Sequence, residues 1–364
     1  MRVLLALPYC NPNGTEGHVL ILTRYLIEQG HSVTVAAPSG PMEQAFIQAG
    51  ARFLSLPPIL PSSFLRVAGI LAKNASQQDL CHFHAAMELC VGLRLFEKKT
   101  PLVFTAHCYH TEWDYVKAGL FLNPTCQATV AVSTAERNRL LRWGLDESRN
   151  HLIFNGIESN RFGEKKGNLK KELGLKNELL IGTIGRLVPS KRIEDLIEAA
   201  AILRMSLPEV HFAVVGSGPQ LPKLVRRIDR LGLRKNFHLL GQRDDVPDIL
   251  ASLDLFAMPT EREGLPLACL EAMASGLPVV CTDIPEFADF IEPGVNGLQV
   301  PVGHHGALAE ALEKLIAAPI LRRRLGENAR ETSNRFSAER MAERTLELYE
   351  KIISSGKKEK ILLF

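Results

Sequence analysis

The stretch LDLFAMPTEREGLPLACLEAMASGLPVVCT, residues 253–282, decides the fold of this chain. Its two ends, LDLFAM and PVVCT, are continuous apolar runs, which are typical of strands buried on both faces of a sheet. The segment between them predicts a helix that ends at Gly276 and carries Pro266 in its first turn, where proline costs no hydrogen bond. We expect this helix to begin near Gly264 and Leu265. A strand, a helix and a strand in this order indicate an α/β protein.

The same alternation runs through the rest of the 364 residues. Further continuous β-rich runs are VLLAL, SVTVAA, LVFTA, ATVAV, LLIGTIG and HFAVVG. Apolar residues at helical spacing lie between them, for example over 15–29 and 192–205. The pattern predicts parallel, doubly wound sheets.

A domain boundary is expected within 161–177, a charged stretch with three glycines after which the alternation restarts. We expect two Rossmann-like domains, 1–163 and 164–336. A last helix, 337–364, follows the second domain and could pack back on the first, which the sequence alone does not show.

Composition excludes several classes of protein. The net charge of +3 does not indicate a general nucleic-acid binder. Seven scattered cysteines, an odd number, fit free thiols in a reducing compartment, so we expect a cytoplasmic protein. No stretch reaches ~18 uninterrupted apolar residues, and the opening VLLALP is interpreted as a strand rather than a signal segment.

Two carboxylates, Glu263 and Glu271, flank the start of the helix expected between the two strands. Carboxylates suit the hydroxyls of a sugar or a ribose, and the free N–H groups of a helix start suit a phosphate. Gly264 would let a ligand approach the backbone. The alternative is an ordinary carboxylate at a helix N-terminus together with a solvated helix glutamate.

Two cations, Arg186 and Lys191, follow the strand LLIGTIG at the edge where open α/β sheets bind ligands. Both suit phosphate oxygens, and cations are mildly unfavourable at a helix start unless they have a partner. The alternative is a pair of surface cations. Two cations for a diphosphate and two carboxylates for hydroxyls predict a nucleotide-sugar site.

The turn VVGSGP, residues 214–219, weakly resembles a dinucleotide-binding fingerprint, because Leu221 occupies the place of the third glycine. Gly216 allows either close approach of a nucleotide or a plain strand-to-helix turn. A nicotinamide-dependent dehydrogenase is therefore disfavoured.

Residues 178–300 resemble the donor domain of retaining GT-B glycosyltransferases of family 4, the glycosyl transferases group 1. The matching pieces are GRLVPSK, VVGSGP, LLGQRDDVPDILASLDLFAMPT and EGLPLACLEAMASGLPVV. The resemblance implies two Rossmann-like domains that face a central cleft, the first for the acceptor and the second for a UDP- or GDP-linked sugar donor. We expect no further cofactor. We also expect no metal, because no Asp-x-Asp motif is present and Arg186 and Lys191 can replace a divalent ion. The sequence departs from the family at Pro266 and Arg192, where glycine is frequent, and in TDIPEF.

The resemblance also implies roles for individual residues. Arg186 and Lys191 neutralise the donor diphosphate, Glu271 binds the ribose, and Glu263 and His107 lie by the transferred sugar as catalytic residues. Further donor contacts are expected from Gly14, Gly216, Gly241, Arg243, Val246, Gly264, Leu265 and Pro266.

The stretches DLCHFHAA and VFTAHCYHTE are rich in histidine and cysteine. No zinc-ligand spacing is present among these residues, so a zinc site is disfavoured; its candidate ligands would be Cys81, His82, His84, Cys90, His107, Cys108 and His110. We favour strand ends in which His82 is structural and His84 and His110 contact the acceptor. In the first domain, the turn Asn13-Gly14 precedes a helix that Thr15 is expected to cap.

The resemblance thus implies a retaining hexosyltransferase of bacterial surface polysaccharide or glycolipid synthesis. Its expected partners are a nucleotide-sugar donor and a saccharide or lipid-linked acceptor, without nucleic acid. Leu65, Arg66, Lys98 and Lys99 suggest peripheral contact with the inner face of a membrane. Two alternatives stay open: a nucleotide-sugar 2-epimerase of the same fold and a non-catalytic nucleotide-sugar sensor.

Overall fold

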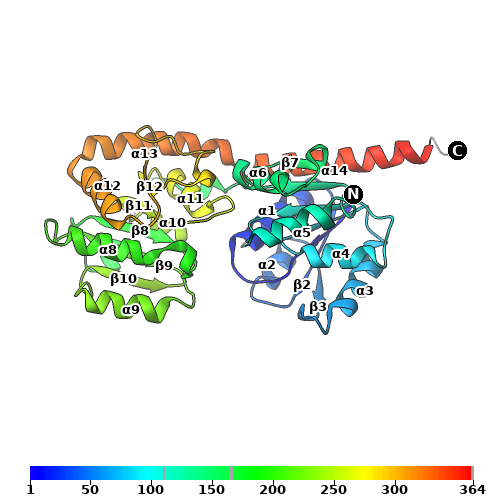
Figure 1. Cartoon of the computed structure of the whole chain (residues 1–364), viewed down its shortest axis with the longest axis horizontal. Helices are drawn as coiled ribbons and strands as arrows, with labels where there is room; N and C mark the ends of the chain where they lie inside the picture. The colour runs from blue at the N-terminus through cyan, green and yellow to red at the C-terminus, as the bar shows by residue number, and fades with distance from the viewer. Residues whose placement is uncertain (110, 164–166, 362–364) are drawn as a thin grey trace. The chain divides into compact units, whose positions relative to one another are not determined.

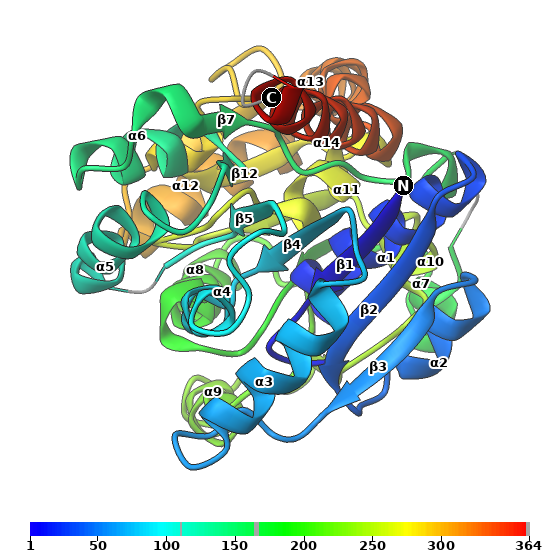
Figure 2. The same ribbon diagram turned by 90° about the vertical axis from the view of Figure 1, so that its right-hand side faces the viewer.

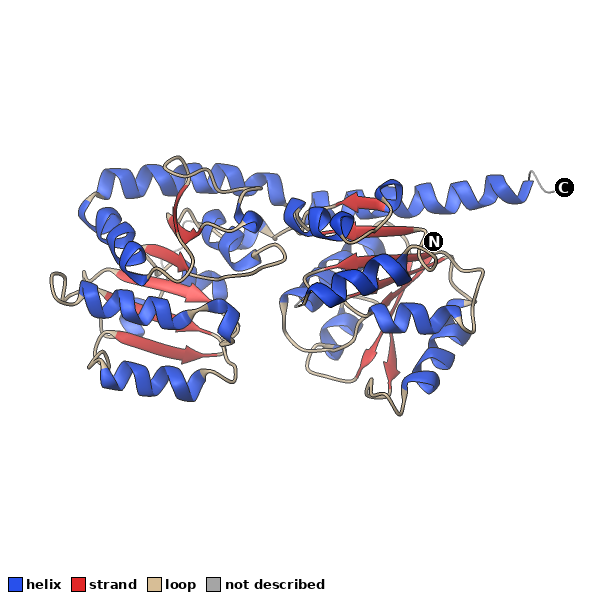
Figure 3. Ribbon diagram, in the orientation of Figure 1, coloured by secondary structure: helices blue, strands red, loops and turns tan. Residues whose placement is uncertain are grey.

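The computed structural model describes residues 1–109, 111–163 and 167–361. The chain forms two compact units, one made of Met1–Gly156 together with Ala338–Phe364 and the other of Ile157–Ser337 (Figure 1). The division falls after Gly156, where the sequence suggested residue 163. In both units helices surround a sheet whose strands are all parallel (Figure 3).

The first unit is built on a seven-stranded sheet of order β3-β2-β1-β4-β5-β6-β7. Its strands are β1 (Arg2–Ala6), β2 (Ser32–Pro38), β3 (Arg52–Leu56), β4 (Leu80–His84), β5 (Leu102–Ala106), β6 (Ala128–Ala131) and β7 (Asn150–Leu152). The central strands are apolar along most of their length because both faces are covered. The strand order reverses between β1 and β4, where Val3 pairs with Leu80.

Helices cover both faces of this sheet (Figure 2). They are α1 (Gly14–Glu28), α2 (Glu43–Gln48), α3 (Phe64–Ala75), α4 (Met87–Arg94), α5 (Glu112–Leu122), α6 (Thr134–Arg142) and α14 (Ala338–Ile361). One core contains side chains of α3 to α6, and the other contains side chains of α1, α2 and α14. The last helix therefore belongs to the first unit, where the phenol of Tyr349 is completely buried.

The second unit has a six-stranded sheet of order β10-β9-β8-β11-β12-β13. Its strands are β8 (Leu180–Ile184), β9 (His211–Val215), β10 (Phe237–Gly241), β11 (Leu255–Met258), β12 (Val279–Thr282) and β13 (Gly297–Val300). Its α-helices are α7 (Leu169–Glu172), α8 (Ile193–Leu203), α9 (Leu221–Arg230), α10 (Val246–Leu250), α11 (Leu267–Ala274), α12 (His305–Ala317) and α13 (Pro319–Ser333). The strand order reverses between β8 and β11, where Ile181 pairs with Leu255.

The predicted fold class is confirmed: both sheets are parallel and doubly wound. The predicted start of α11 is wrong, because Pro266 takes the N-cap position and the helix begins at Leu267. The predicted cap of α1 is also wrong, because Asn13 is the N-cap residue and Thr15 lies inside the helix. Within the described part of the chain, no helix is both long and apolar enough to cross a bilayer.

Candidate functional site

The second unit gathers charged side chains where its strand order reverses. Loops after β8 and β11 leave adjacent strands at this point, which is where open α/β sheets bind ligands. Lys191 ends a short 3-10 helix, Pro189–Lys191, after β8, and Glu263 lies in the loop after β11. The Lys191 ammonium donates to Oε1 of Glu263. Their side chains are 16% and 9% exposed, so the pair is largely withdrawn from water.

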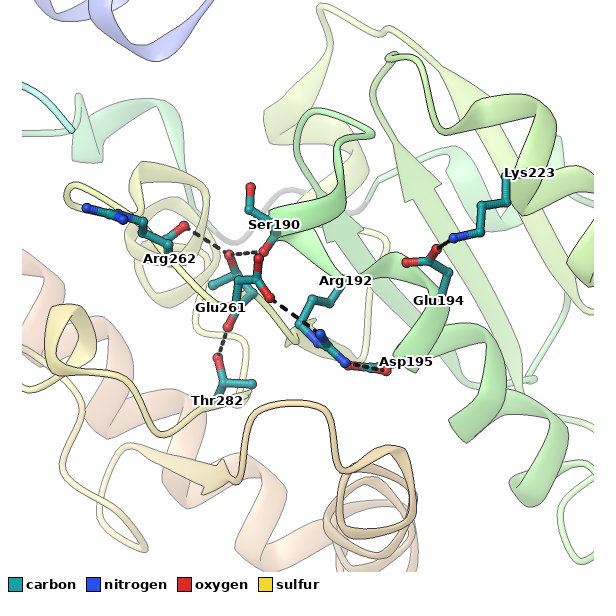
Figure 4. A network of polar contacts seen from close by, with 9 residues as sticks. Ser190, Arg192, Glu194, Asp195, Lys223, Glu261, Arg262 and Thr282 are labelled. Carbon is teal, nitrogen blue, oxygen red and sulfur yellow. Dashed lines mark hydrogen bonds and ion pairs between the residues drawn. The ribbon is translucent and has the colours of Figure 1, made fainter. Parts of the chain in front are cut away.

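Hydrogen bonds to backbone carbonyls fix the two loops against each other (Figure 4). The carbonyl of Ser190 accepts hydrogen bonds from the Thr260 hydroxyl, at 3.0 Å, and from the Glu261 N–H, at 2.9 Å. The Thr282 hydroxyl donates to the carbonyl of Thr260, which is fully buried. These bonds keep the loops that carry Lys191 and Glu263 together, although 72 positions separate the two residues in the chain.

Arg192 occupies a position where glycine is frequent in the family that the sequence resembles. Its φ of 49° lies in the left-handed region, which glycine adopts without steric cost. Two ion pairs of the Arg192 side chain offset the steric cost of this backbone conformation (Figure 4). The guanidinium donates to Asp195, with Nε 2.6 Å from Oδ2, and to Glu261 at 3.4 Å. The geometry that glycine would adopt freely is thus held by ion pairs.

Arg186 is the second cation of this edge. It follows β8 and its side chain is exposed. It makes no ion pair or side-chain hydrogen bond with any residue that the structure describes. Its guanidinium is therefore available for an anion.

Glu271 lies on α11 and is half-buried. Burial raises the pKa of its carboxyl to about 7, and the charge of Arg161 opposes this shift. Across the described residues the carboxyl has no hydrogen-bond or ion-pair partner. A carboxyl with a raised pKa and no internal partner is a frequent sign of a binding site.

The glycine turn after β9 has a packing explanation. Gly216 has a φ of 138°, and a Cβ atom there would lie 1.9 Å from the Gly185 carbonyl oxygen. The Gly216 N–H donates to the carbonyl of Gly241 at 2.8 Å. The chain's own loops thus require glycine at position 216, whether or not a nucleotide approaches.

The remaining donor contacts suggested by the sequence lie around this edge. Gly241, with a φ of 68°, ends β10, and Val246 begins α10. Arg243 is held between Asp245 and Glu172, with contacts of 2.7 to 3.1 Å, so a ligand would compete with two carboxylates for it.

The residues that precede α11 differ in exposure. Gly264 is partly exposed, whereas the side chain of Leu265 is buried. A donor contact from Leu265 is therefore expected through its backbone. Pro266 contributes no N–H at the start of the helix.

The first unit brings three histidines together. His18 comes from the first turns of α1, His84 ends β4, and His107 follows β5. Nδ1 of His84 lies 3.2 Å from Nε2 of His107, and the His18 ring lies 4.9 Å from the His107 ring, centroid to centroid. Burial lowers the pKa of all three rings, which favours their neutral forms.

His82 lies beside this cluster, and both of its ring nitrogens have partners. Nδ1 lies 2.5 Å from the Tyr349 hydroxyl, and Nε2 lies 2.7 Å from the Thr105 hydroxyl. Gly14 is exposed as the first residue of α1. His110, expected to contact the acceptor, lies outside the described residues.

Sequence reasoning missed His18, which has no ligand-like spacing to the other histidines because it comes from a different element. It also missed Glu286, which is fully buried. Oε1 of Glu286 lies 3.4 Å from the backbone N–H of Glu263. The only available signal for Glu286 was the TDIPEF segment, which departs from the family pattern.

Two parallel α/β sheets of this topology define the GT-B class of folds. Among solved structures, an Anabaena protein, Alr3699/HepE, crystallised in complex with UDP and glucose, matches with a TM-score of 0.88 at 22% identity, over 96% of this chain and 100% of that one. At this identity the likeness supports the fold alone.

Family models match both units. "Glycosyltransferase Family 4" matches residues 12–161, and "Glycosyl transferases group 1" matches residues 165–332. The chain therefore belongs to the glycosyltransferase family that these two models together describe, and it has the GT-B fold.

Curated relatives match over different lengths. The putative glycosyltransferase EpsD of Bacillus subtilis is 26% identical over 81% of this chain and 77% of its own. The exopolysaccharide phosphotransferase SCO2592 of Streptomyces coelicolor is 36% identical over 46% of this chain, but only 18% of its own length is matched.

Proposed function

We propose that this chain is a retaining glycosyltransferase that moves a hexosyl unit from a nucleotide diphosphate sugar to an acceptor hydroxyl. The observation that carries the proposal is the contact between Lys191 and Glu263 where the strand order reverses. The exposed guanidinium of Arg186, which follows β8 and has no partner among the described residues, supports it. Cations for a diphosphate and a carboxylate for the adjoining sugar thus follow two neighbouring strands, β8 and β11, of one sheet. The names of the relatives favour synthesis of a bacterial polysaccharide or glycolipid.

The cations act on the leaving group. As the bond between the anomeric carbon and the phosphate oxygen breaks, negative charge grows on the diphosphate. Lys191 uses one N–H for Glu263 and keeps two for phosphate oxygens, while Arg186 offers a planar fork. The N–H groups at the start of α11 add to this stabilisation. Preorganised donors of this kind commonly contribute more to the rate of an enzyme than any other single effect.

The acceptor enters from the face that the leaving group vacates, in keeping with the family. A bond forms between the acceptor oxygen and the anomeric carbon, and the hydroxyl proton passes to the departing phosphate oxygen. No side chain is needed as a strong base. Glu263 and His107 contact the transferred sugar and Glu271 accepts hydrogen bonds from the ribose, with Gly14 and Gly216 at the donor backbone and His84 toward the acceptor.

The identity of the base and the sugar is tested by thermal shift with UDP, GDP, ADP and their sugars, because a ligand that binds the native state raises the melting temperature. Arg186→Ala is expected to lose most of the shift. Glu261→Gln, at the other loop carboxylate, is the matched control and is expected to retain it. No shift with any nucleotide, or equal shifts in both variants, would overturn the proposal.

Catalysis is proposed to be independent of a metal. The sequence has no Asp-x-Asp motif, and Arg186 and Lys191 carry the charge that a divalent ion would supply. Transfer is expected to continue in excess chelator. Complete loss of transfer that magnesium or manganese restores would refute this part.

Two rivals are separated by simple assays. A 2-epimerase converts the nucleotide sugar without an acceptor, so donor alone is expected to stay unchanged here. A sensor binds the donor without turnover. For the proposed transferase, by contrast, Glu263→Ala should abolish transfer while donor affinity is kept. An epimerised donor, or a wild-type chain that binds but never transfers, would favour the rivals.

A peripheral contact with a membrane would bring a lipid-linked acceptor to the enzyme. Exposed apolar side chains of the first unit, Leu65, Leu95 and Phe96, lie on or just after α3 and α4 together with Lys98 and Lys99. Such a mixture suits anionic lipid surfaces. Sedimentation with anionic vesicles, and its loss in Lys98→Glu/Lys99→Glu, tests the contact; equal sedimentation of both proteins would exclude it.

A further inference from the structure

The three histidines of the first unit form a compact cluster. The ring centroids of His18, His84 and His107 lie 4.9 to 5.5 Å apart. One candidate ligand nitrogen from each ring lies within 4.8 Å of the other two. Three separate elements deliver the rings, so their convergence comes from the fold and not from a local spacing.

The distances within this cluster approach those of a tetrahedral metal centre. Zinc–nitrogen bonds of about 2.0–2.1 Å place two ligand nitrogens about 3.3 Å apart along a tetrahedron edge. Nδ1 of His84 and Nε2 of His107 already lie 3.2 Å apart. His18 needs to move by ~1.5 Å or less to complete the same face, which is within reach of a side-chain rotation.

Two buried ring atoms have no hydrogen-bond partner among the described residues. They are Nδ1 of His18 and Nε2 of His84, in side chains of which His18 is 4% exposed and His84 is fully buried. An unsatisfied buried nitrogen is costly, and ligation of an ion through Nδ1 of His18 recovers part of that cost. His84 presents Nδ1 to His107, so its unsatisfied Nε2 is not the ligating atom. His107 is partly exposed, so solvent reaches one member of the cluster.

We propose that His18, His84 and His107 bind one transition-metal dication of the zinc type, with solvent as the fourth ligand. Three neutral imidazoles and an open position are a frequent ligand set for zinc, and imidazole also suits copper and nickel. His82 stays outside the set, because Tyr349 and Thr105 occupy both of its nitrogens.

The proposed site has a consequence for the proposed transfer reaction, and this part rests on the proposed function. A metal ion held by His107 withdraws that imidazole from the transferred sugar. Zinc at saturation is therefore expected to inhibit transfer, and chelator to restore it. The site is then inhibitory, and it is compatible with catalysis that needs no metal.

Binding is tested on the full chain, freed of metal with chelator and desalted. Calorimetric titration with Zn²⁺ is expected to give one equivalent at micromolar dissociation constant or tighter, and Co²⁺ is expected to give visible absorption of a tetrahedral centre. His18→Asn and His84→Asn should each weaken binding at least tenfold, with circular dichroism confirming the fold. The control is His304→Ala/His305→Ala, which removes an exposed histidine pair of the other unit and should leave the tight equivalent unchanged.

The outcomes separate the two proposals. Absence of a tight equivalent, or its loss only in the His304→Ala/His305→Ala variant, overturns the metal site. Tight binding that His18→Asn abolishes, without inhibition of transfer, keeps the metal site and removes the sugar-contacting role of His107.

Discussion

Donor binding is predicted to strengthen with pH because of Glu271. The pKa of its carboxyl is raised to about 7 by burial. In the proposed role, ribose hydroxyls donate to the ionised form of this carboxyl. A group with this pKa is ionised in about one molecule in eleven at pH 6 and in about ten in eleven at pH 8. The dissociation constant of the donor should therefore be about tenfold larger at pH 6, or about 1.4 kcal/mol.

The assay is calorimetric titration with the nucleotide sugar that gives the largest thermal shift. Its diester phosphates keep their charge between pH 6 and 8, whereas a free nucleoside diphosphate gains a proton. Titration in two buffers of different ionisation enthalpy should show that binding at pH 7 releases a fraction of a proton. Glu271→Gln should bind more weakly than the wild type at pH 8 and show a flat pH profile.

The pH dependence of the free energy of unfolding provides a second test, which does not depend on the ligand. The pKa of Glu271 is higher in the folded chain than its usual value of 4.5, so the protonated form favours folding. This contribution is fully present below pH 4.5 and is lost as the pH rises through 7. Glu271→Gln should thus gain stability relative to the wild type at pH 8, by at most about 3 kcal/mol, and little at pH 5.

A flat donor profile in the wild type, or the same slope in Glu271→Gln, would refute the ribose role. If the stability arm still holds in that case, the carboxyl is buried as described but binds no ribose. If neither arm holds, the raised pKa itself is refuted.

Three further predictions concern the loops. Lys191→Met leaves Glu263 buried without its cation and should lower the free energy of unfolding by about 3 kcal/mol in chemical denaturation. The double variant Lys191→Met/Glu263→Gln should recover most of this loss, and a double variant as unstable as the single one would contradict a direct pair. Gly216→Ala forces a Cβ atom against the Gly185 carbonyl and should lower stability by more than about 2 kcal/mol, so an unchanged melting temperature would refute the close approach. Arg192→Gly should stay within about 1 kcal/mol of the wild type, since relief of left-handed backbone strain offsets the lost ion pairs, whereas Arg192→Ala should be clearly less stable; equal stabilities of the two variants would show that the backbone is not strained.

Much of the fold could be predicted because the strands of a doubly wound sheet are apolar from end to end. VLLAL, LVFTA and HFAVVG each form a strand at the predicted place. All four edge strands, β3, β7, β10 and β13, were missed, because RFLSL, NHL, FHLLG and GLQV are very short, alternate with polar residues or carry glycine.

The candidate site was predicted only as far as local sequence reaches. Residue type and position after a strand suggested Lys191 and Glu263 separately, but no spacing predicts a direct bond across 72 positions. The left-handed backbone at Arg192 was unforeseen, since a non-glycine residue there depends on the carboxylates that hold it. His18 joined its cluster through tertiary packing alone.

The position of α14 has a consequence for how the chain is made. Polypeptides leave the ribosome from the N-terminus, and domains generally fold as they emerge. Here the first 156 residues cannot finish their core until α14 is made, because this helix helps to cover one face of their sheet, supplies Tyr349 and is translated after the second unit. The segment 157–337 is complete earlier, so the unit that is synthesised second should reach its native state first. Until α14 has been synthesised, the nascent first unit exposes apolar surface that chaperones recognise.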